Sequence, residues 1–228
     1  MDGGRLLSVR VHMGFCKMGF KPRIRAISVA GLVFFAFLGQ ALAEKIDIVG
    51  FGDSLMAGYQ LEPGQSFPEK LEAALEAKGH DVSIANAGVS GDTTSGGLGR
   101  LDWSVPDGTD LVILELGAND MLRGVSPSIT ESNLDAMLAR LKERGIDVVL
   151  AGMLAAPNLG ADYAEAFNGL YPRLAGKYDV TFFPFFMEGV ATNGQLLLDD
   201  GLHPNAEGVD RMVAEALPYV EEAISQLD

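Results

Sequence analysis

Apolar runs typical of buried strands alternate with amphipathic helical segments five times after residue 44. The third run, residues 111–116, is almost continuously apolar, as central parallel strands are. This alternation predicts an α/β fold: a doubly wound parallel sheet with a helix layer on each face. Ligands of such sheets bind outside the carboxyl ends of the strands. The expected strands are residues 45–50, 81–85, 111–116, 148–152 and 180–183, and the expected helices are 66–79, 94–100, 128–144, 162–175 and 205–225.

Two of the expected helices begin with a capping-box pattern, in which a serine is followed three residues later by a glutamate. Ser66 and Glu69 predict the start of the first helix, and Ser128 and Glu131 predict the start of the third. Trp103, the one tryptophan, is expected to pack in the core.

Residues 1–43 are expected to be a secretory signal peptide and not part of the fold. A basic stretch at 21–25 precedes an apolar run at 26–39, and Ala-Leu-Ala at 41–43 forms an A-x-A cleavage site. A retained membrane anchor is the alternative, but the apolar run is shorter than the ~20 residues that a span needs. Met13 and Met18 are alternative start residues to Met1.

The mature chain, residues 44–228, is long enough for one domain and is strongly acidic. The leader holds six of the 17 Lys and Arg residues and one of the 31 acids, so the rest carries a formal net charge of −19. Such a charge disfavours nucleic acid and anionic lipid surfaces as partners. We expect no stable membrane insertion, and a monomer or a weak homodimer.

The one cysteine, Cys16, precedes the cleavage site. The mature chain therefore has no disulfide, no cysteine metal site and no cysteine nucleophile. An exported protein without disulfides suits the periplasm or the medium, although other oxidising compartments are not excluded.

A glycine-rich stretch at 49–58 follows the first strand and places Ser54 just past the strand end. Its glycines are expected to let the backbone turn sharply and to leave room for a ligand. Leu55 occupies the third glycine position of a dinucleotide fingerprint, so that motif is absent. The stretch is not a G-x-S-x-G elbow either, because Asp53 precedes the serine and Met56 replaces the second glycine.

A reactive serine needs a base, and the base needs an orienting acid. His203 is the better candidate for the base, because Asp200 precedes it by one turn and Gly201 permits a tight bend. A surface turn with His203 as a bystander is the alternative. His80 lies at the amino end of the second strand, the wrong edge of the sheet for a catalytic role.

Acyl transfer also needs donors for the developing oxyanion. Gly91 offers an unobstructed backbone N–H just past the second strand, and Asn119 offers a side-chain amide just past the third. An Asx turn that closes the strand is the alternative for Asn119.

Taken together, four segments resemble the conserved blocks of the GDSL, or SGNH, hydrolases. They are Gly-Asp-Ser-Leu at 52–55, Gly91, Gly-Ala-Asn-Asp at 117–120 and Asp-Gly-Leu-His at 200–203. The resemblance covers nearly all of the mature chain. Further stretches at 90–93, 114–117, 163–167 and 184–188 are similar to the periplasmic acyl-thioesterase, lysophospholipase and arylesterase branch.

The resemblance implies a flavodoxin-like α/β/α sandwich with a five-stranded parallel sheet, and neither a metal nor another cofactor. It implies Ser54 as nucleophile, His203 as base and Asp200 as its orienter. It also implies an oxyanion hole from the amides of Ser54 and Gly91 together with Asn119. Family members hydrolyse aryl esters, short to medium acyl esters, acyl thioesters and lysophospholipids.

An apolar acyl groove is expected beside these motifs, although core packing is the default for each apolar candidate. A carbohydrate O-acetyl esterase on the same scaffold and a non-catalytic binding module are the competing interpretations. The candidates for the groove are Leu55, Met121, Leu122, Leu154 and Pro157.

Overall fold

The structure is a computed structural model that describes residues 45–227 and the isolated residues 1, 8, 10, 12–14 and 19. The expected signal peptide lies outside the described residues, apart from those few positions. Residues 45–227 contain one sheet of five parallel strands in the order β2-β1-β3-β4-β5, which confirms the expected fold class. The strands are β1 (Ile46–Gly52), β2 (Val82–Gly88), β3 (Leu111–Glu115), β4 (Asp147–Ala151) and β5 (Thr181–Phe183).

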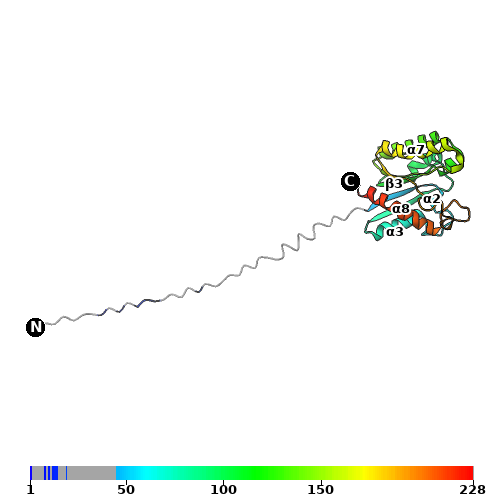
Figure 1. Cartoon of the computed structure of the whole chain (residues 1–228). Helices are drawn as coiled ribbons and strands as arrows, with labels where there is room; N and C mark the ends of the chain where they lie inside the picture. Colours follow the sequence, from blue (N-terminus) through cyan, green and yellow to red (C-terminus); the bar gives the residue numbers. More distant parts are fainter. Residues whose placement is uncertain (2–7, 9, 11, 15–18, 20–44, 228) are drawn as a thin grey trace. The chain divides into compact units, whose positions relative to one another are not determined.

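Helices cover both faces of this sheet. One layer contains α3 and α8, which contact each other. The other contains α4, α6 and α7, and α6 contacts both of its neighbours. Figure 1 shows α7 on one side of β3 and α3 and α8 on the other. The helices are α2 (Ser54–Ala57), α3 (Phe67–Ala77), α4 (Thr94–Ser104), α5 (Ala118–Leu122), α6 (Pro127–Glu143), α7 (Ala161–Tyr178) and α8 (Ala206–Ile224), with short 3₁₀ turns η1 (Pro157–Leu159) and η2 (Gly194–Leu196).

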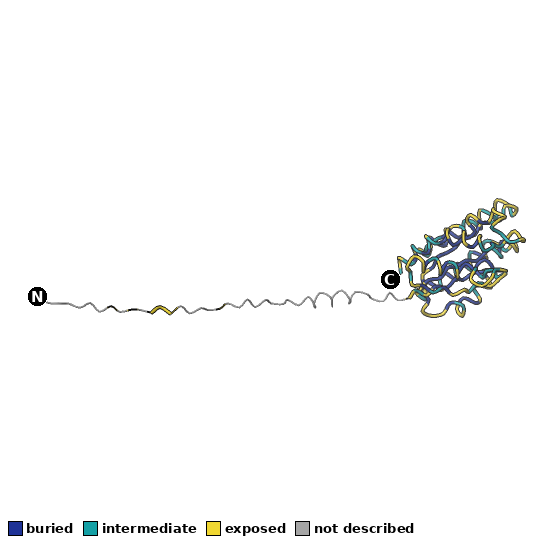
Figure 2. Tube along the Cα trace, turned by 90° about the horizontal axis from the view of Figure 1, so that it is seen from below, coloured by how far each residue is buried: buried dark blue, intermediate teal, exposed yellow. Residues whose placement is uncertain are grey.

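The core lies between the sheet and the two helix layers. Every residue of β3 is buried, as expected for the central strand of a parallel sheet covered on both faces. Figure 2 shows this buried centre enclosed by exposed loops and outer helix faces. Burial of apolar area on both faces is the main term that stabilises this arrangement.

The strand order changes direction between β1 and β3. The chain passes from β1 to β2 on one side and then returns to β3 on the other, so β1 pairs with both. In open α/β sheets this switch point opens a crevice at the carboxyl ends of the two strands. Ser54 follows β1 and Asn119 follows β3, so both lie at this crevice.

Several boundaries differ from those expected. The capping box at Ser66 and Glu69 is present, but that at Ser128 is wrong, because Ser126 is the N-cap of α6 and Pro127 its first residue. Proline suits the first helical position, since its φ is already helical and it has no N–H to leave unpaired. Trp103 is 75% exposed on α4, so its expected place in the core is also wrong.

The glycine-rich stretch also differs from its expected role. Gly50 and Gly52 do not turn the chain, because both belong to β1. They are required by close packing: a Cβ on Gly52 would lie 2.5 Å from Oε2 of Glu115. The turn is made later, at Gly58, where φ is 78°.

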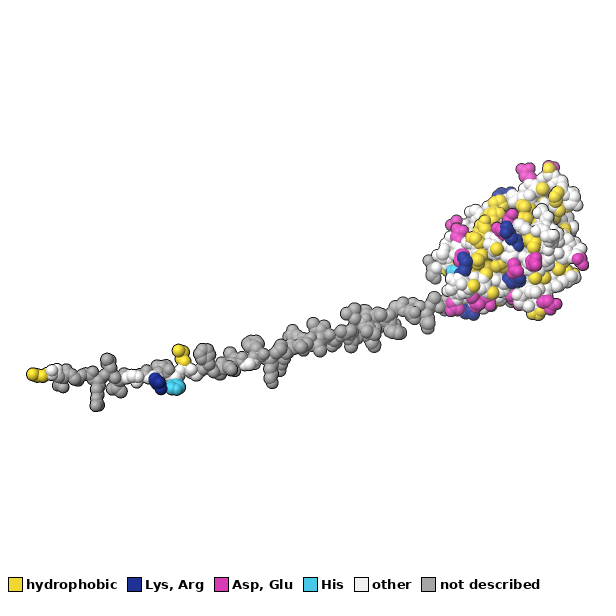
Figure 3. All heavy atoms as spheres, turned by 60° about the horizontal axis from the view of Figure 1, so that its bottom comes forward, with side chains coloured by type: hydrophobic (Ala, Val, Ile, Leu, Met, Phe, Trp, Pro, Cys, Tyr) yellow, Lys and Arg dark blue, Asp and Glu magenta, His cyan; other side chains and the backbone are white. Residues whose placement is uncertain are grey.

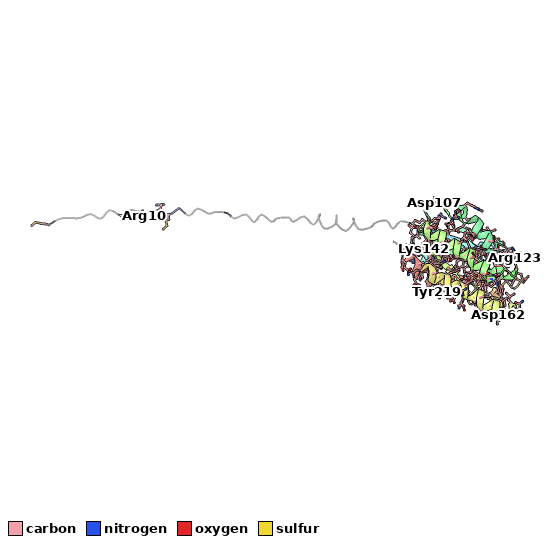
Figure 4. All side chains as sticks on the ribbon, turned by 90° about the horizontal axis from the view of Figure 1, so that it is seen from above. Arg10, Asp107, Arg123, Lys142, Asp162 and Tyr219 are labelled. Carbon is pink, nitrogen blue, oxygen red and sulfur yellow. The ribbon has the colours of Figure 1, made fainter. Side chains whose placement is uncertain are left out.

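Residues that follow the strands and residues that precede them lie toward opposite ends of the domain. Figure 4 shows Arg123 and Asp162, which follow β3 and β4, toward one end, and Asp107 and Lys142, which precede those strands, toward the other. The face in Figure 3 carries acidic side chains at many places, in keeping with the negative net charge. Among the residues that the structure describes, no helix is long and apolar enough to cross a bilayer.

Candidate active site

Ser54 is held at the carboxyl end of β1 as the first residue of α2. Ser54 is only 8% exposed. Asp53 caps this short helix, because its Oδ1 accepts the N–H of Leu55 at 3.0 Å. Gly58 ends the helix in the left-handed region, at a φ that favours glycine. The position of the Ser54 hydroxyl is therefore set by backbone geometry on both sides.

His203 and Asp200 lie in a tight turn between η2 and α8. The N–H of Leu198 donates to the carbonyl of His203 at 2.8 Å and closes the turn. Gly201, with a φ of 69°, allows the chain to bend at its tip. The turn brings the Asp200 carboxylate beside the imidazole.

Ser54, His203 and Asp200 form a continuous chain of hydrogen bonds. Oγ of Ser54 lies 2.8 Å from Nε2 of His203, and Nδ1 of His203 lies 2.7 Å from Oδ2 of Asp200. The backbone N–H groups of His203 and Leu202, together with the imidazole, lower the pKa of Asp200 to about 2. Asp200 is therefore a carboxylate at neutral pH and orients the imidazole toward Ser54.

Tyr59 adds a contact that the sequence did not predict. Its ring centroid lies 4.4 Å from that of His203, with 37° between the ring planes. Contact with one face of the imidazole limits its rotation. By contrast, His80 lies outside this site, where its Nε2 is 3.3 Å from a carboxylate oxygen of Glu221.

Three donors face the same pocket as the Ser54 hydroxyl. The backbone N–H groups of Ser54 and Gly91 have no acceptor among the described residues. Asn119, in α5, donates one amide N–H to Oδ2 of Asp53 at 2.8 Å, which leaves its second N–H for a ligand. Backbone and amide N–H donors around one pocket are the kind of groups that stabilise an oxyanion.

Side chains missed by sequence reasoning hold Gly91 in place. Asp120 accepts from the N–H of Thr94 at 2.8 Å and from its hydroxyl at 2.5 Å. Arg123, labelled in Figure 4, donates to the carbonyl of Gly91 at 2.7 Å. The loop between β2 and α4 is thus tied to the segment that follows β3.

Arg100 joins three parts of the site from beneath. Its buried guanidinium donates to the carbonyls of Gly52 and Ala87, each at 2.8 Å, and to Oδ2 of Asp92 at 2.7 Å. It also lies over the ring of Phe51, 4.0 Å from the centroid. An arginine among expected helical residues carries no sequence signal for such a role, because these three acceptors lie in β1, in β2 and in the loop before α4, outside its own helix.

A second feature missed from the sequence is a pair of buried acids, Asp53 and Glu115. Burial raises the pKa of Glu115 well above its usual range, and the neighbouring Asp53 raises it further. Burial also raises the pKa of Asp53, whereas hydrogen bonds from Leu55 and Asn119 oppose this shift. The one available sequence signal was an acid inside an otherwise apolar strand.

The donors and the Ser54 hydroxyl open into a cavity of about 480 Å³. Four of the five expected groove residues line it, namely Leu55, Met121, Leu122 and Leu154. Pro157, in η1, is exposed and is not among its lining residues. Apolar lining residues that the sequence did not single out are Met153, Phe185, Met187, Ala191 and Leu202.

A hydroxyl, an imidazole and a carboxylate in series, beside an oxyanion pocket at the carboxyl edge of a parallel sheet, define the site of an α/β serine hydrolase. Residues 51–211 match the model of the GDSL-like lipase/acylhydrolase family. The chain therefore belongs to this family and is a carboxylic ester hydrolase of the GDSL type.

Relatives of known name support this assignment. An arylesterase of Vibrio mimicus is 40% identical over 201 residues, which cover 88% of this chain and 96% of the relative. The thioesterase 1/protease 1/lysophospholipase L1 of Escherichia coli K12 is 36% identical over 193 residues, which cover 82% and 91%. The crystal structure of AlinE4, an SGNH-hydrolase family esterase, is 48% identical with a TM-score of 0.68, covering 81% of this chain and 99% of that one.

Proposed function

We propose that the protein is an exported serine esterase and thioesterase that forms an acyl-enzyme on Ser54. Its substrates would be aryl esters, short to medium acyl esters, acyl thioesters and lysophospholipids. The observation that supports this most directly is the 2.8 Å contact between Oγ of Ser54 and Nε2 of His203, with Asp200 on the opposite nitrogen.

In the first step Oγ of Ser54 attacks the substrate carbonyl while Nε2 of His203 takes the hydroxyl proton. The tetrahedral intermediate then expels the alcohol or thiol, which receives that proton from the imidazole. In the second step His203 takes a proton from water, the hydroxide adds to the acyl group, and Ser54 is regenerated with release of the acid. Asp200 stabilises the imidazolium in both steps.

The negative oxygen of each intermediate would accept hydrogen bonds from the N–H groups of Ser54 and Gly91 and from the amide of Asn119. Such donors stabilise the transition state most, because charge on the oxygen grows only as the bond to Ser54 forms. The free N–H groups at Ser54 and Gly91 support this role.

The lining of the pocket supports an acyl substrate. Methionine, leucine and phenylalanine side chains surround the cavity, and a pocket of about 480 Å³ accommodates an acyl group of short to medium length. A carbohydrate O-acetyl esterase would need polar side chains to bind sugar hydroxyls, so the apolar lining disfavours that alternative. A binding module would not need Ser54, His203 and Asp200 in series.

Labelling with a fluorophosphonate probe tests the nucleophile. The folded wild-type protein should be labelled at one site, and Ser54→Ala should abolish labelling and lower kcat on the order of 10⁶-fold. The control is Ser95→Ala, which changes an exposed serine on α4 and should label as the wild type does. Labelling of Ser54→Ala at the wild-type rate would contradict the proposal.

A substrate panel tests specificity. Aryl esters and acyl thioesters from acetyl to palmitoyl, a lysophospholipid and acetylated xylan should be assayed with the mature protein. Activity on acetylated xylan with none on the acyl esters and thioesters would favour the carbohydrate esterase. Export is tested separately: the protein secreted by a bacterial host should begin at Glu44.

A further inference from the structure

Two carboxyl groups lie in contact beneath Ser54. Neither Asp53 nor Glu115 has any exposed surface. The backbone N–H of Asp53 donates to Oε2 of Glu115 at 3.2 Å, and each side chain shifts the pKa of the other. Gly52 permits this approach, because a Cβ there would lie 2.5 Å from Oε2 of Glu115. A side chain at Gly52, the first residue of the Gly-Asp-Ser-Leu block, would therefore collide with Glu115.

Two carboxylates in contact and without solvent cannot both carry a charge. Tyr171 on α7 interacts electrostatically with Glu115, Asp53 and Asp120, and none of these groups supplies a positive charge. Arg100 donates to the Gly52 carbonyl and to neither acid, and His203 faces Asp53 and not Glu115. The pair therefore holds one proton.

Hydrogen bonding decides which acid holds the proton. Asp53 accepts from the N–H of Leu55 at 3.0 Å and from Nδ2 of Asn119 at 2.8 Å, and both bonds favour the anion. Oε1 of Glu115 is buried without a hydrogen-bond partner. An unpaired oxygen costs far less on a neutral acid than on a carboxylate. The proton therefore belongs to Glu115.

The location of the proton sets the orientation of Asn119. An ionised Asp53 can only accept, so it selects the amide orientation that turns Nδ2 toward it. A protonated Asp53 could donate to Oδ1 of Asn119 and stabilise the flipped amide. In the flipped amide Oδ1 would face Asp53, and Nδ2 would take the place of Oδ1. The second N–H of Asn119, now left for a ligand, would then no longer lie where it does.

We propose that Glu115 is a positioning residue of the oxyanion hole: it holds the shared proton, keeps Asp53 an acceptor, and through Asp53 orients the amide of Asn119. This inference rests on the proposed role of Asn119 as an oxyanion donor. Glu115 touches no substrate, so its effect should appear in kcat and not in KM.

Two substitutions separate positioning from simple packing. Glu115→Gln keeps a neutral group whose oxygen can accept from the N–H of Asp53, so kcat should stay within a few-fold of the wild type. Glu115→Leu removes that bond and the neighbour that holds the proton, so the buried Asp53 should take the proton itself. We expect kcat to fall by roughly 10- to 10²-fold, less than for loss of an oxyanion donor, with KM unchanged.

Ile113→Ala is the matched control for disruption of β3. It creates a cavity in the same buried strand but removes no hydrogen-bonding group, so it should lower Tm without lowering kcat of the folded protein. If Ile113→Ala lowers kcat as much as Glu115→Leu does, the effect is one of strand disruption and the proposal is wrong.

A double-mutant cycle tests the route through Asn119. Since Glu115 acts on that amide, Glu115→Leu should add nothing to Asn119→Ala, and the double variant should equal Asn119→Ala alone. Multiplicative losses would overturn the proposal. Wild-type kcat in Asn119→Ala would instead contradict the proposed function, so the two failures are distinguishable.

Infrared spectroscopy reads the proton without reference to activity. The wild-type spectrum at pH 7 minus that of Glu115→Gln should contain the carbonyl stretch of a protonated carboxylic acid. Its absence, with only carboxylate bands in the difference, would overturn the assignment of the proton to Glu115 even if every kinetic result agreed.

Discussion

The hydroxyl of Ser54 lies 2.8 Å from Nε2 of His203 although 149 positions separate the two residues in the chain. Ser54 is fixed by the end of β1, and His203 by the turn that precedes α8. Because these supports belong to opposite ends of the domain sequence, the contact exists only when the sheet and the last helix are packed together. We therefore expect activity to be lost with global unfolding and not before it.

The hydrogen bonds of Asp200 predict that this carboxylate stays charged across the working pH range. Its pKa of about 2 lies below the usual value, so the carboxylate stays charged until the pH falls to that range. Protonation of Asp200 should therefore play no part in any fall of kcat/KM between pH 8 and pH 4, and its carboxylate band in the infrared difference spectrum against Asp200→Asn should persist to pH 4. Loss of that band above pH 4 would contradict this.

Replacing Asp200 should impair the imidazole without removing it. Asp200→Asn keeps the size of the side chain but loses the charge that stabilises the imidazolium and fixes its tautomer. By analogy with other serine hydrolases, kcat should fall by roughly 10⁴-fold. The control is Asp199→Asn, one residue earlier and exposed, which should leave kcat near the wild-type value. Equal effects of the two changes would exclude a specific role for Asp200.

Loss of the Asn119 amide should slow both chemical steps. Asn119→Ala removes one oxyanion donor, and we expect kcat to fall by ~10²–10³ with little change in KM. Asn158→Ala, an exposed asparagine in η1, is the control and should behave as the wild type does. Steady-state kinetics with an aryl ester give both constants; an unchanged kcat in Asn119→Ala would reject its role.

Gly88 allows β2 to pack closely against α2, the helix that carries Ser54. A Cβ at this position would lie 2.3 Å from the backbone nitrogen of Ala57, in the helix that carries Ser54. Gly88→Ala should therefore destabilise the fold by about 1–3 kcal/mol and displace the Ser54 hydroxyl. A displacement of about 1 Å can cost ~10² in rate, so kcat should fall as well.

Gly99→Ala is the matched control for this substitution. Gly99 lies inside α4, and a Cβ there meets no atom within 4 Å. Alanine should stabilise the helix by about 0.4–1 kcal/mol and leave kcat unchanged. Thermal unfolding and aryl-ester kinetics on both variants check the pair. If Gly88→Ala is as stable and active as Gly99→Ala, the close approach of β2 to α2 does not constrain the site.

Arg100 should contribute far more to stability than an arginine on the surface. Arg100→Met leaves the Asp92 carboxylate and two backbone carbonyls without their partner in a largely buried place. Breaking a buried ion pair of this kind costs about 3–5 kcal/mol. Arg140 pairs with Asp102 at the surface, where both side chains are half exposed, so Arg140→Met should cost at most about 1 kcal/mol. Urea unfolding of both variants measures the difference.

Much of the fold follows from local patterns in the sequence. The five strands were predicted because apolar periodicity reports burial directly, and each lies within a few residues of its expected place. The boundaries were less secure. Ser128 resembled an N-cap, but Pro127 begins α6, and the run of glycines that suggested a turn is part of β1. Each signal was local, and a competing local preference or a tertiary contact overrode it.

Residues that touch the acyl carbonyl in the proposed mechanism were all named from the sequence, because motif spacing marks them. The residues that hold these groups in place were not named from the sequence. Glu115 was not singled out within an almost continuously apolar strand, and Tyr59 and Arg100 carried no signal. What each of them does depends on partners that are far away in the chain.

The sequence by itself determined the sheet and the helix layers and marked Ser54, Asp200 and His203 as candidates, since hydrophobic periodicity and short motifs are properties of neighbouring residues. Tertiary structure alone decided that Glu115 meets Asp53, that Arg100 reaches three separate segments and that Tyr59 covers His203. The physical reason is that a buried polar group takes its charge and orientation from whichever partners packing brings to it, and those partners are not its neighbours in sequence.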